Sequence, residues 1–364
     1  MSAAEDALSH LRVIAVSQRA AGGRAESEAR RYCATVLEKA GFSLSEEPFE
    51  FSAFPGRYAT PLAGVLAIAG LLLAWRAGTR GAVDEALITL LSFGMAIGLG
   101  AGWLARYGVL SLPLLRARSV NLVATRGNPN VWIMAHLDSK SQVVPIGLRA
   151  AAITGVVLIW LAAIAASAAH LAGWTRNADI PWPWIIGAGV TSAIPVALTF
   201  LGEGSNGALD NASGVAAALL TASLLPAGRS LGVLITSAEE LGLAGARAWV
   251  SERAPASVIN FDGLDDAGQL RLMWTRQRPE RLLGVLSDAA AEHGISARVT
   301  RLFPGILVDA VAFADAGWKS VTISKATLSS VARIHTRGDT MDHLHGDGIV
   351  GAALITVSAL ERLA

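Results

Sequence analysis

Two adjacent carboxylates, Glu239 and Glu240, follow one of the most apolar stretches of the sequence. The preceding residues 231–236 form an unbroken apolar run, which predicts a strand that is buried on both faces. Ligands bind at the carboxyl ends of strands in open α/β sheets, so these two acids lie where a binding site is expected. Neighbouring carboxylates repel each other unless a positive charge lies between them or one is protonated. The pair therefore indicates either a cation site or a solvated pair of glutamates on the surface.

Residues of the types that ligate metals also follow other predicted strands. They are His136 and Asp138 after 131–135, Asp262 after 258–261, and His335, through a loop, after 320–324. A further acid, Asp210, precedes an apolar helix, where it could simply cap the helix. If the strands are parallel, however, their ends share one edge of the sheet and bring these side chains together. Histidine, aspartate and glutamate without cysteine suit zinc or another first-row divalent metal.

Predicted strands alternate with predicted helices along the polar parts of the sequence, which indicates an α/β layered fold with a mainly parallel sheet. Residues 24–40, for example, carry apolar side chains at helical spacing and are followed by Gly41, a typical helix stop. The predicted strands are 42–51, 121–125, 131–135, 231–236, 258–261 and 320–324, and the predicted helices are 2–20, 24–40, 212–225, 244–253, 280–293, 308–316 and 345–363.

Four long apolar runs interrupt this pattern and predict membrane-spanning helices. They are 59–75, 86–105, 150–169 and 182–201, and each approaches the roughly 20 residues that a helix needs to cross a bilayer. The composition agrees, because 52% of the residues are hydrophobic and only 16% are charged. Tryptophans cluster at the ends of the runs, as interfacial tryptophans do; they are Trp75, Trp103, Trp174, Trp182 and Trp184.

Short connectors join the runs in pairs, so each pair is predicted to be a hairpin that returns the chain to the side it left. The sequence therefore predicts one discontinuous domain, 1–57, 107–148 and 203–364, interrupted by a first hairpin, 58–106, and a second, 149–202. In the first hairpin Gly94, Gly98 and Gly102 lie four residues apart. This spacing could let the helix pack closely on a second copy of the chain.

The net charge, the cysteine count and the distribution of arginines restrict the classes of function and the cellular location that the sequence allows. A formal net charge of +1 gives no basis for nucleic-acid binding, and the single cysteine, Cys33, excludes an internal disulfide and a cysteine metal cage. The acidic start lacks the pattern of a secretory signal peptide. Arginines are more frequent on the side of the polar domain than in the far loops, which favours a multi-pass membrane protein with its catalytic domain in the cytoplasm.

Five motifs, taken in order, carry a family resemblance. They are A-H-L-D-S, G-A-L-D-N-A-S-G-V, S-A-E-E-L-G-L-A-G, V-I-N-F-D and H-T-R-G-D-T-M-D. Together they resemble the co-catalytic di-zinc aminopeptidase family, peptidase clan MH, which includes bacterial leucyl aminopeptidases, aminopeptidase Y and glutamate carboxypeptidases. The resemblance covers 1–57, 119–142 and 203–364. It implies a three-layer α/β/α, phosphorylase/hydrolase-like zinc exopeptidase domain with a mainly parallel mixed sheet, to which the four transmembrane helices in two hairpins are added.

The resemblance also implies a role for each site residue. His136 and Asp262 would bind one zinc ion, Glu240 and His335 the other, and Asp210 would bridge both. Glu239 would be the general base, and Asp138 would support His136 by accepting a hydrogen bond from its ring N–H. The family pattern further implies a cis peptide bond between Asp210 and Asn211.

These roles imply a membrane-anchored aminopeptidase that cleaves N-terminal peptide bonds with a hydroxide bound to two Zn²⁺ ions, although cobalt or manganese suits the same ligands. Its expected partners are a peptide substrate and the lipid bilayer, and a homo-oligomer could form through the glycine-lined span. Two departures affect the substrate pocket: Leu209 replaces an acid or amide, and Val308-Asp309-Ala310 replaces Ser-Asp-His. A zinc enzyme resembling glutaminyl cyclases and a non-catalytic scaffold or receptor with a peptidase fold are the alternatives. A transporter is disfavoured because the four spans carry no ionisable residue.

Overall fold

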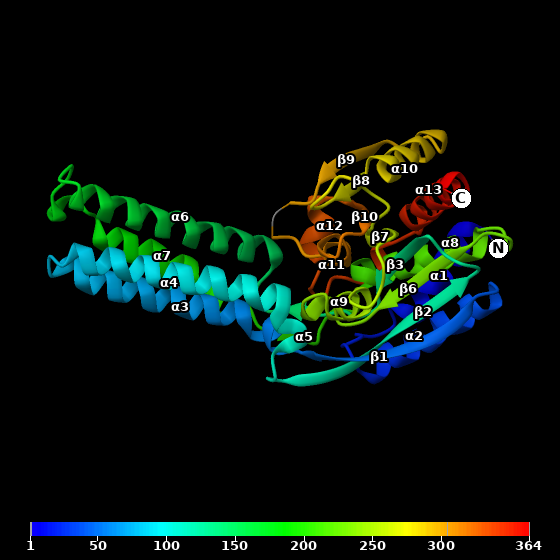
Figure 1. The fold of residues 1–364 in the computed structure, drawn as a ribbon, viewed down its shortest axis with the longest axis horizontal. Coiled ribbons are helices and arrows are strands. Elements are labelled where there is room, and N and C mark those ends of the chain that lie inside the picture. Colours follow the sequence, from blue (N-terminus) through cyan, green and yellow to red (C-terminus); the bar gives the residue numbers. More distant parts are fainter. Residues whose placement is uncertain (1, 304, 364) are drawn as a thin grey trace. The chain divides into compact units, whose positions relative to one another are not determined.

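The chain forms two compact units in the computed structural model, which describes residues 2–303 and 305–363 (Figure 1). The sheet unit comprises 1–51, 116–141 and 203–364, and the helical unit comprises 52–115 and 142–202. The helical unit reaches beyond the predicted first hairpin because residues after Trp103 remain helical. They form a π-helical turn, Leu104–Gly108, and a short helix, α5 (Val109–Ser111).

An eight-stranded sheet is the centre of the sheet unit, with strand order β1-β2-β6-β3-β7-β10-β8-β9. The four middle strands, β6, β3, β7 and β10, run parallel, whereas β2 is antiparallel to β6 and β8 is antiparallel to β10. The strands are β1 (Ser43–Ser52), β2 (Arg116–Arg126), β3 (Val131–His136), β6 (Leu231–Thr236), β7 (Ser257–Leu264), β8 (Gln269–Trp274), β9 (Ala297–Arg301) and β10 (Lys319–Ala326). The predicted mixed, mainly parallel sheet is confirmed.

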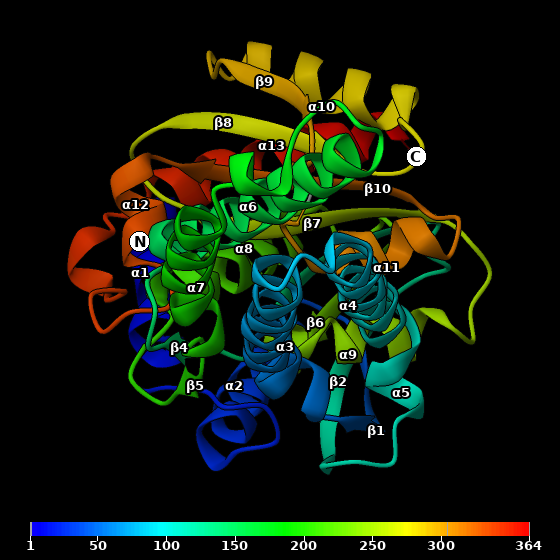
Figure 2. The same cartoon turned by 90° about the vertical axis from the view of Figure 1, so that its left-hand side faces the viewer.

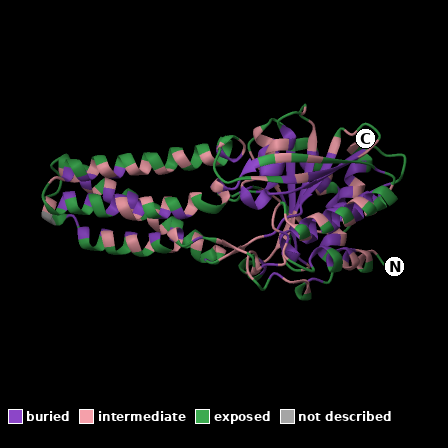
Figure 3. Cartoon of the chain, turned by 90° about the horizontal axis from the view of Figure 1, so that it is seen from below, coloured by how far each residue is buried: buried purple, intermediate pink, exposed green. Residues whose placement is uncertain are grey.

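Helices cover both faces of this sheet, which gives the three layers that the sequence predicts. One face packs against α1 (Ala3–Ile14), α2 (Arg24–Lys39), α8 (Ser213–Leu224), α10 (Glu280–Glu292) and α13 (Asp347–Leu363). The other face packs against α9 (Ala244–Val250) and α11 (Asp309–Asp315). Alternate side chains of the strands supply the two cores: Ile133 and Ile235 face the first group, and Trp132 and Leu234 face the second. Figure 3 shows buried strands between these layers, with exposed residues on other strands, which include β1, β8 and β9.

Two predictions for the sheet unit are wrong in detail. The predicted helix 2–20 ends at Ile14, and the residues before α2 form a loop that contains the buried Arg19. The strands β8 and β9 were not predicted, although Leu270 and Leu272 in β8 alternate with exposed Gln269 and Arg271. That alternation is the signal of a half-buried strand.

The helical unit consists of four long helices, seen almost end-on in Figure 2: α3 (Phe54–Thr79), α4 (Val83–Trp103), α6 (Ile146–Leu171) and α7 (Trp182–Ala197). Helix α3 packs against α4 and α7, and α6 packs against the same two neighbours. Trp160 lies at the centre, where its indole donates a hydrogen bond to Leu90 O at 3.1 Å. A Cβ atom on Gly70 would lie 2.6 Å from this ring, so glycine gives it the space it needs.

Three of the four predicted spans are long and apolar enough to cross a membrane: Phe54–Thr79, Val83–Ser111 and Ile146–Leu171. The fourth prediction, 182–201, is too long. Helix α7 has 16 residues and ends at Ala197, two residues after Pro195. At 1.5 Å per residue it extends about 24 Å, less than the roughly 30 Å of a hydrocarbon core.

Two sequence interpretations of the helical unit also change. Trp182 is buried against Gly78 rather than exposed at a helix end, whereas Trp174 and Trp184 are more than four-fifths exposed. In the glycine series, Gly94 lies against Trp160 within the unit. Neither Gly98 nor Gly102 has a described neighbour within 4 Å of the position its Cβ would take.

The remaining short elements are connectors. They are the paired strands β4 (Ser141–Gln142) and β5 (Leu201–Gly202), the helix α12 (Leu328–Arg333), the π-helical turn η3 (Ala208–Ala212), and the 3₁₀ turns η2 (Asn177–Asp179), η4 (Glu239–Leu241) and η5 (Met341–His343).

Candidate metal centre

The carboxyl ends of the parallel strands carry the predicted site residues, as the strand order requires. His136 is the last residue of β3, the two glutamates begin η4 directly after β6, and Asp262 lies near the end of β7. His335 follows α12 in the left-handed conformation, with φ of 62°, which is unusual for a residue other than glycine and is typical of functional sites. Asp210 lies in η3, and its peptide bond to Asn211 is cis, as predicted.

Two groups of potential metal ligands lie at this edge. His136, Glu239 and Asp262 form one, with ligand atoms within 4.8 Å of one another, and Asp210, Glu240 and His335 form the second by the same criterion. All five predicted metal ligands are thus brought together. Glu239, predicted as the base, lies among the ligands of the first group.

Asp210 joins the two groups through its carboxylate. Its Oδ1 lies 3.1 Å from His136 Nε2, and its Oδ2 lies 3.0 Å from His335 Nε2. Asn211 fixes this loop, because its amide donates to Phe261 O at 2.8 Å and its Oδ1 accepts the backbone N–H of Gly263 at 3.2 Å. The loop of Asp210 is therefore tied to β7 on both sides of Asp262.

Two buried polar atoms in the second group of ligands indicate that these residues fit a cation. Glu240 Oε1 and His335 Nε2 lie 3.1 Å apart, yet neither has a hydrogen-bond partner among the described residues. Buried polar atoms are rarely left without a partner, so an acceptor and a ring nitrogen that face each other fit a shared cation. Carboxylate oxygens and imidazole nitrogens are the donor set that zinc takes in cysteine-free sites.

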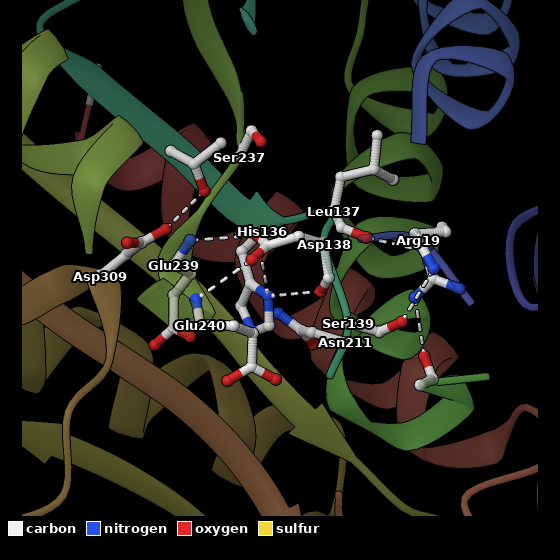
Figure 4. A network of polar contacts seen from close by, with 12 residues as sticks. Arg19, His136, Leu137, Asp138, Ser139, Asn211, Ser237, Glu239, Glu240 and Asp309 are labelled. Carbon is white, nitrogen blue, oxygen red and sulfur yellow. Dashed lines mark hydrogen bonds and ion pairs between the residues drawn. The ribbon is translucent and has the colours of Figure 1, made fainter. Parts of the chain in front are cut away.

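Asp138 supports the site in a different way from that predicted. Its two carboxylate oxygens accept the backbone N–H groups of Glu239 and Glu240, at 3.0 and 3.1 Å (Figure 4). His136 Nδ1 instead lies 3.1 Å from the backbone carbonyl of Asp138, and 3.8 Å from its carboxylate. The carboxylate of Asp138 therefore orients the backbone of Glu239 and Glu240, which begin η4. The backbone carbonyl of Asp138 sets the tautomer of His136.

A second carboxylate, Asp339, holds the loop of Asp210 in the same manner. It accepts the backbone N–H groups of Leu209 and Asp210 at 2.7 and 3.2 Å, and it is 2% exposed. The sequence assigned no role to this residue, because the N–H groups that donate to it come from a segment 130 residues earlier. The backbone of both glutamates and of Asp210 is thus oriented by a buried aspartate.

Lys140 is a further residue that the motifs did not single out. Its ammonium lies 2.6 Å from Glu240 Oε2, so Oε1 of the same carboxylate is left for another partner. Burial alone would raise the pKa of Glu240, but His335 and Lys140 hold it at about 2. Burial raises the pKa of Glu239 well above its usual value; His136 opposes this shift, and Glu240 adds to it. Two adjacent glutamates therefore differ strongly in proton affinity.

Comparison with known proteins agrees with this geometry. Residues 189–359 match the model of peptidase family M28. The matched stretch is just under half of the chain and supports a metallopeptidase. This stretch contains Asp210, both glutamates, Asp262 and His335, whereas His136 and Asp138 precede it. No curated protein sequence matches the chain.

Solved structures of aminopeptidases and of a glutaminyl cyclase share the fold at low sequence identity. An aminopeptidase from Aneurinibacillus sp. strain AM-1 is 15% identical with a TM-score of 0.59, over 99% of this chain and 93% of that one. BSAP, a zinc aminopeptidase from Bacillus subtilis, is 14% identical with a TM-score of 0.57, over 99% and 95%. A glutaminyl cyclase from Fimbriiglobus ruber is 11% identical with a TM-score of 0.55, over 98% and 94%. The family match and the shared fold confirm the predicted zinc-dependent metallopeptidase.

Proposed function

We propose that the chain is a membrane-anchored exopeptidase that removes N-terminal residues from peptides and uses two metal ions. The observation that carries the proposal is the position of Asp210, whose two carboxylate oxygens each face a different histidine. Such a carboxylate can belong to two cation sites at once. We assign His136 and Asp262 to one ion, Glu240 and His335 to the other, and zinc as the metal, with cobalt or manganese as substitutes.

When bound, a pair of divalent ions polarises the peptide carbonyl and makes a water molecule acidic near neutral pH. Glu239 then has the properties of a general base. It is buried among the ligands, its pKa is raised by burial, and it does not take part in the Asp210–His335–Glu240 group. A carboxylate with a raised pKa can take a proton from water and pass it to the leaving amine.

The environments of the two glutamates assign their separate roles. Glu240 has a pKa of about 2 and keeps its charge throughout the working range, as a ligand must. Burial raises the pKa of Glu239, so this carboxylate takes up a proton more readily than Glu240, as a base must. Asp138 holds the backbone of both residues and so keeps the two carboxylates in their positions.

A panel of substrates tests the proposed activity. The zinc-loaded protein is expected to release the first residue from peptides with a free N-terminus and to leave N-acetylated copies intact. The likeness to a glutaminyl cyclase makes an N-terminal glutaminyl peptide the essential comparison. Loss of ammonia from that peptide without hydrolysis of any other would favour the cyclase, and no turnover of either kind would favour a scaffold.

Membrane anchoring by the helical unit is supported by its three long apolar helices. Leu158, near the middle of α6, is 61% exposed within the described structure. An arginine at the centre of a spanning helix costs about 2.5–3.5 kcal/mol of insertion free energy. Leu158→Arg is therefore expected to shift the protein from the carbonate-resistant membrane fraction to the soluble or aggregated fraction. Leu158→Ala is the control, and equal membrane retention of both variants would contradict the proposal.

The sidedness and the assembly of the protein are further parts of the proposal. We place the catalytic domain in the cytoplasm because of the arginine distribution along the sequence. Self-association through Gly98 and Gly102 is supported only by their spacing and by the absence of a described neighbour within 4 Å of either residue.

A further inference from the structure

Arg19 is a buried cation whose guanidinium donates all its hydrogen bonds to backbone carbonyls. It lies in the loop between α1 and α2 and is 1% exposed. Its Nη1 donates to Ile14 O at 2.8 Å and to Ser17 O at 3.3 Å, which anchors the side chain to the end of α1. The other three hydrogen bonds leave this segment and reach two separate parts of the metal centre.

The first of these parts is the loop after β3. Arg19 Nε donates to Leu137 O at 2.7 Å, and Leu137 is the residue between His136 and Asp138 (Figure 4). The backbone of Arg19 is paired with the same loop, because its N–H donates to Ser139 Oγ and its carbonyl accepts from Ser139 N, both at 3.0 Å. Three hydrogen bonds therefore hold the segment that carries His136.

The second part is the loop that leads to Asp210. Arg19 Nη1 donates to Asn206 O at 2.6 Å, and Nη2 donates to Gly207 O at 2.9 Å. Ser139 Oγ links the two loops directly through Ser205 O, at 3.3 Å. A single guanidinium thus spans the loop of one metal-ligand histidine and the loop of the bridging aspartate.

The burial of this cation is costly, and its partners carry no charge. Desolvation of a charged group disfavours its burial unless the remaining interactions are nearly complete. Burial lowers the pKa of Arg19 to about 10, although Asp339 and Asp138 raise it, so the group stays charged at neutral pH. A planar guanidinium offers five N–H donors in a fixed fork, whereas a lysine ammonium offers three donors at a single point.

We propose that Arg19 is a positioning residue for the metal centre, which sets the distance between the loops of His136 and Asp210. This inference rests on the proposed function, because it assumes that these two residues hold metal. Arg19 touches neither ligand side chain, and it lies outside the stretch that matches the peptidase family. Its action is therefore indirect, through the backbone of both loops.

Zinc affinity of the purified full chain in detergent tests this role, measured by competition with a chromophoric chelator. Residues that support metal ligands typically change affinity about 10–100-fold when replaced, and Arg19→Lys and Arg19→Met are expected to weaken zinc binding by that factor. The visible absorption of the cobalt-loaded variants is expected to change, since the spacing of the ligands changes. Circular dichroism of the metal-free proteins shows whether they fold.

Arg126 provides the matched control, because its guanidinium also donates only to backbone carbonyls. These are Ala40 O, Leu225 O, Pro226 O and Arg229 O, at 3.0–3.2 Å. Arg126 pairs with Leu231, the first residue of β6, so it lies at the opposite end of that strand from the glutamates. Arg126→Lys is expected to keep the zinc affinity and the cobalt spectrum of the unmodified protein.

Unchanged zinc affinity in a folded Arg19→Lys protein would overturn the inference. So would failure of both Arg19 variants to fold while Arg126→Lys folds, because Arg19 would then serve the fold rather than the metal. If the unmodified protein binds no zinc, the proposed function fails first, and this outcome is separate from the other two.

Discussion

Glu239→Gln is expected to lower the rate of peptide hydrolysis by a factor of about 10²–10⁴, the usual contribution of a general base. The glutamine side chain has the same shape and keeps the hydrogen bond from its backbone N–H to Asp138. It cannot accept a proton at the pH of the reaction. The variant is therefore expected to keep its metal, and the loss should appear in kcat rather than in KM.

Glu240→Gln is the control for this prediction, because it changes the neighbouring carboxylate of the same turn. Glu240 faces His335 and Lys140, so this substitution is expected to reduce metal content as well as the rate. Metal analysis of both variants beside their steady-state kinetics distinguishes the two roles. Loss of metal from Glu239→Gln, or a rate within a few-fold of the unmodified protein, would contradict the assignment.

Asp210→Asn is expected to have the largest effect of any single substitution, because it removes the charge shared by both cation sites. In the proposed two-metal site Asp210 would face both ions, because its two carboxylate oxygens each lie beside a different histidine. Neither ion is expected to bind tightly, and hydrolysis should fall to the background rate. Metal content by mass spectrometry after gel filtration gives the result directly.

The comparison for Asp210→Asn is Asp262→Asn, because Asp262 belongs to the group of His136, whereas Asp210 lies beside both His136 and His335. This variant is expected to lose one ion and to keep the other. Equal metal loss from the two variants would show that Asp210 does not bridge the sites.

The sequence predicted the parts of the fold that follow from local pattern. The buried strands 231–236 and 131–136 are continuous apolar runs, and their periodicity is independent of the rest of the chain. Their parallel arrangement follows from the alternation with helices, and this arrangement brings His136, Glu239 and Glu240 to one edge. Motif order then indicated the family, and the five predicted ligands lie within two adjacent groups.

Interactions between distant segments could not be predicted in the same way. The carboxylate of Asp339 holds backbone groups at Leu209 and Asp210, and Arg19 holds carbonyls near residues 137 and 207, so neither role leaves a local pattern. The end of α7 was predicted wrongly because hydropathy continues past Ala197, where the helix ends with Leu198 as its C-cap. A high hydropathy indicates that a segment is buried or faces lipid, but the end of a helix depends on backbone hydrogen bonding.

The proposal that this site is a two-metal peptidase is tested most directly by titrating the metal-free protein with zinc while following release of the N-terminal residue from a peptide. The rate is expected to be negligible without zinc and to reach its plateau at about two equivalents per chain, as in other two-metal hydrolytic sites. A plateau at one equivalent, or a rate that does not respond to zinc at any ratio, would contradict the two-metal account.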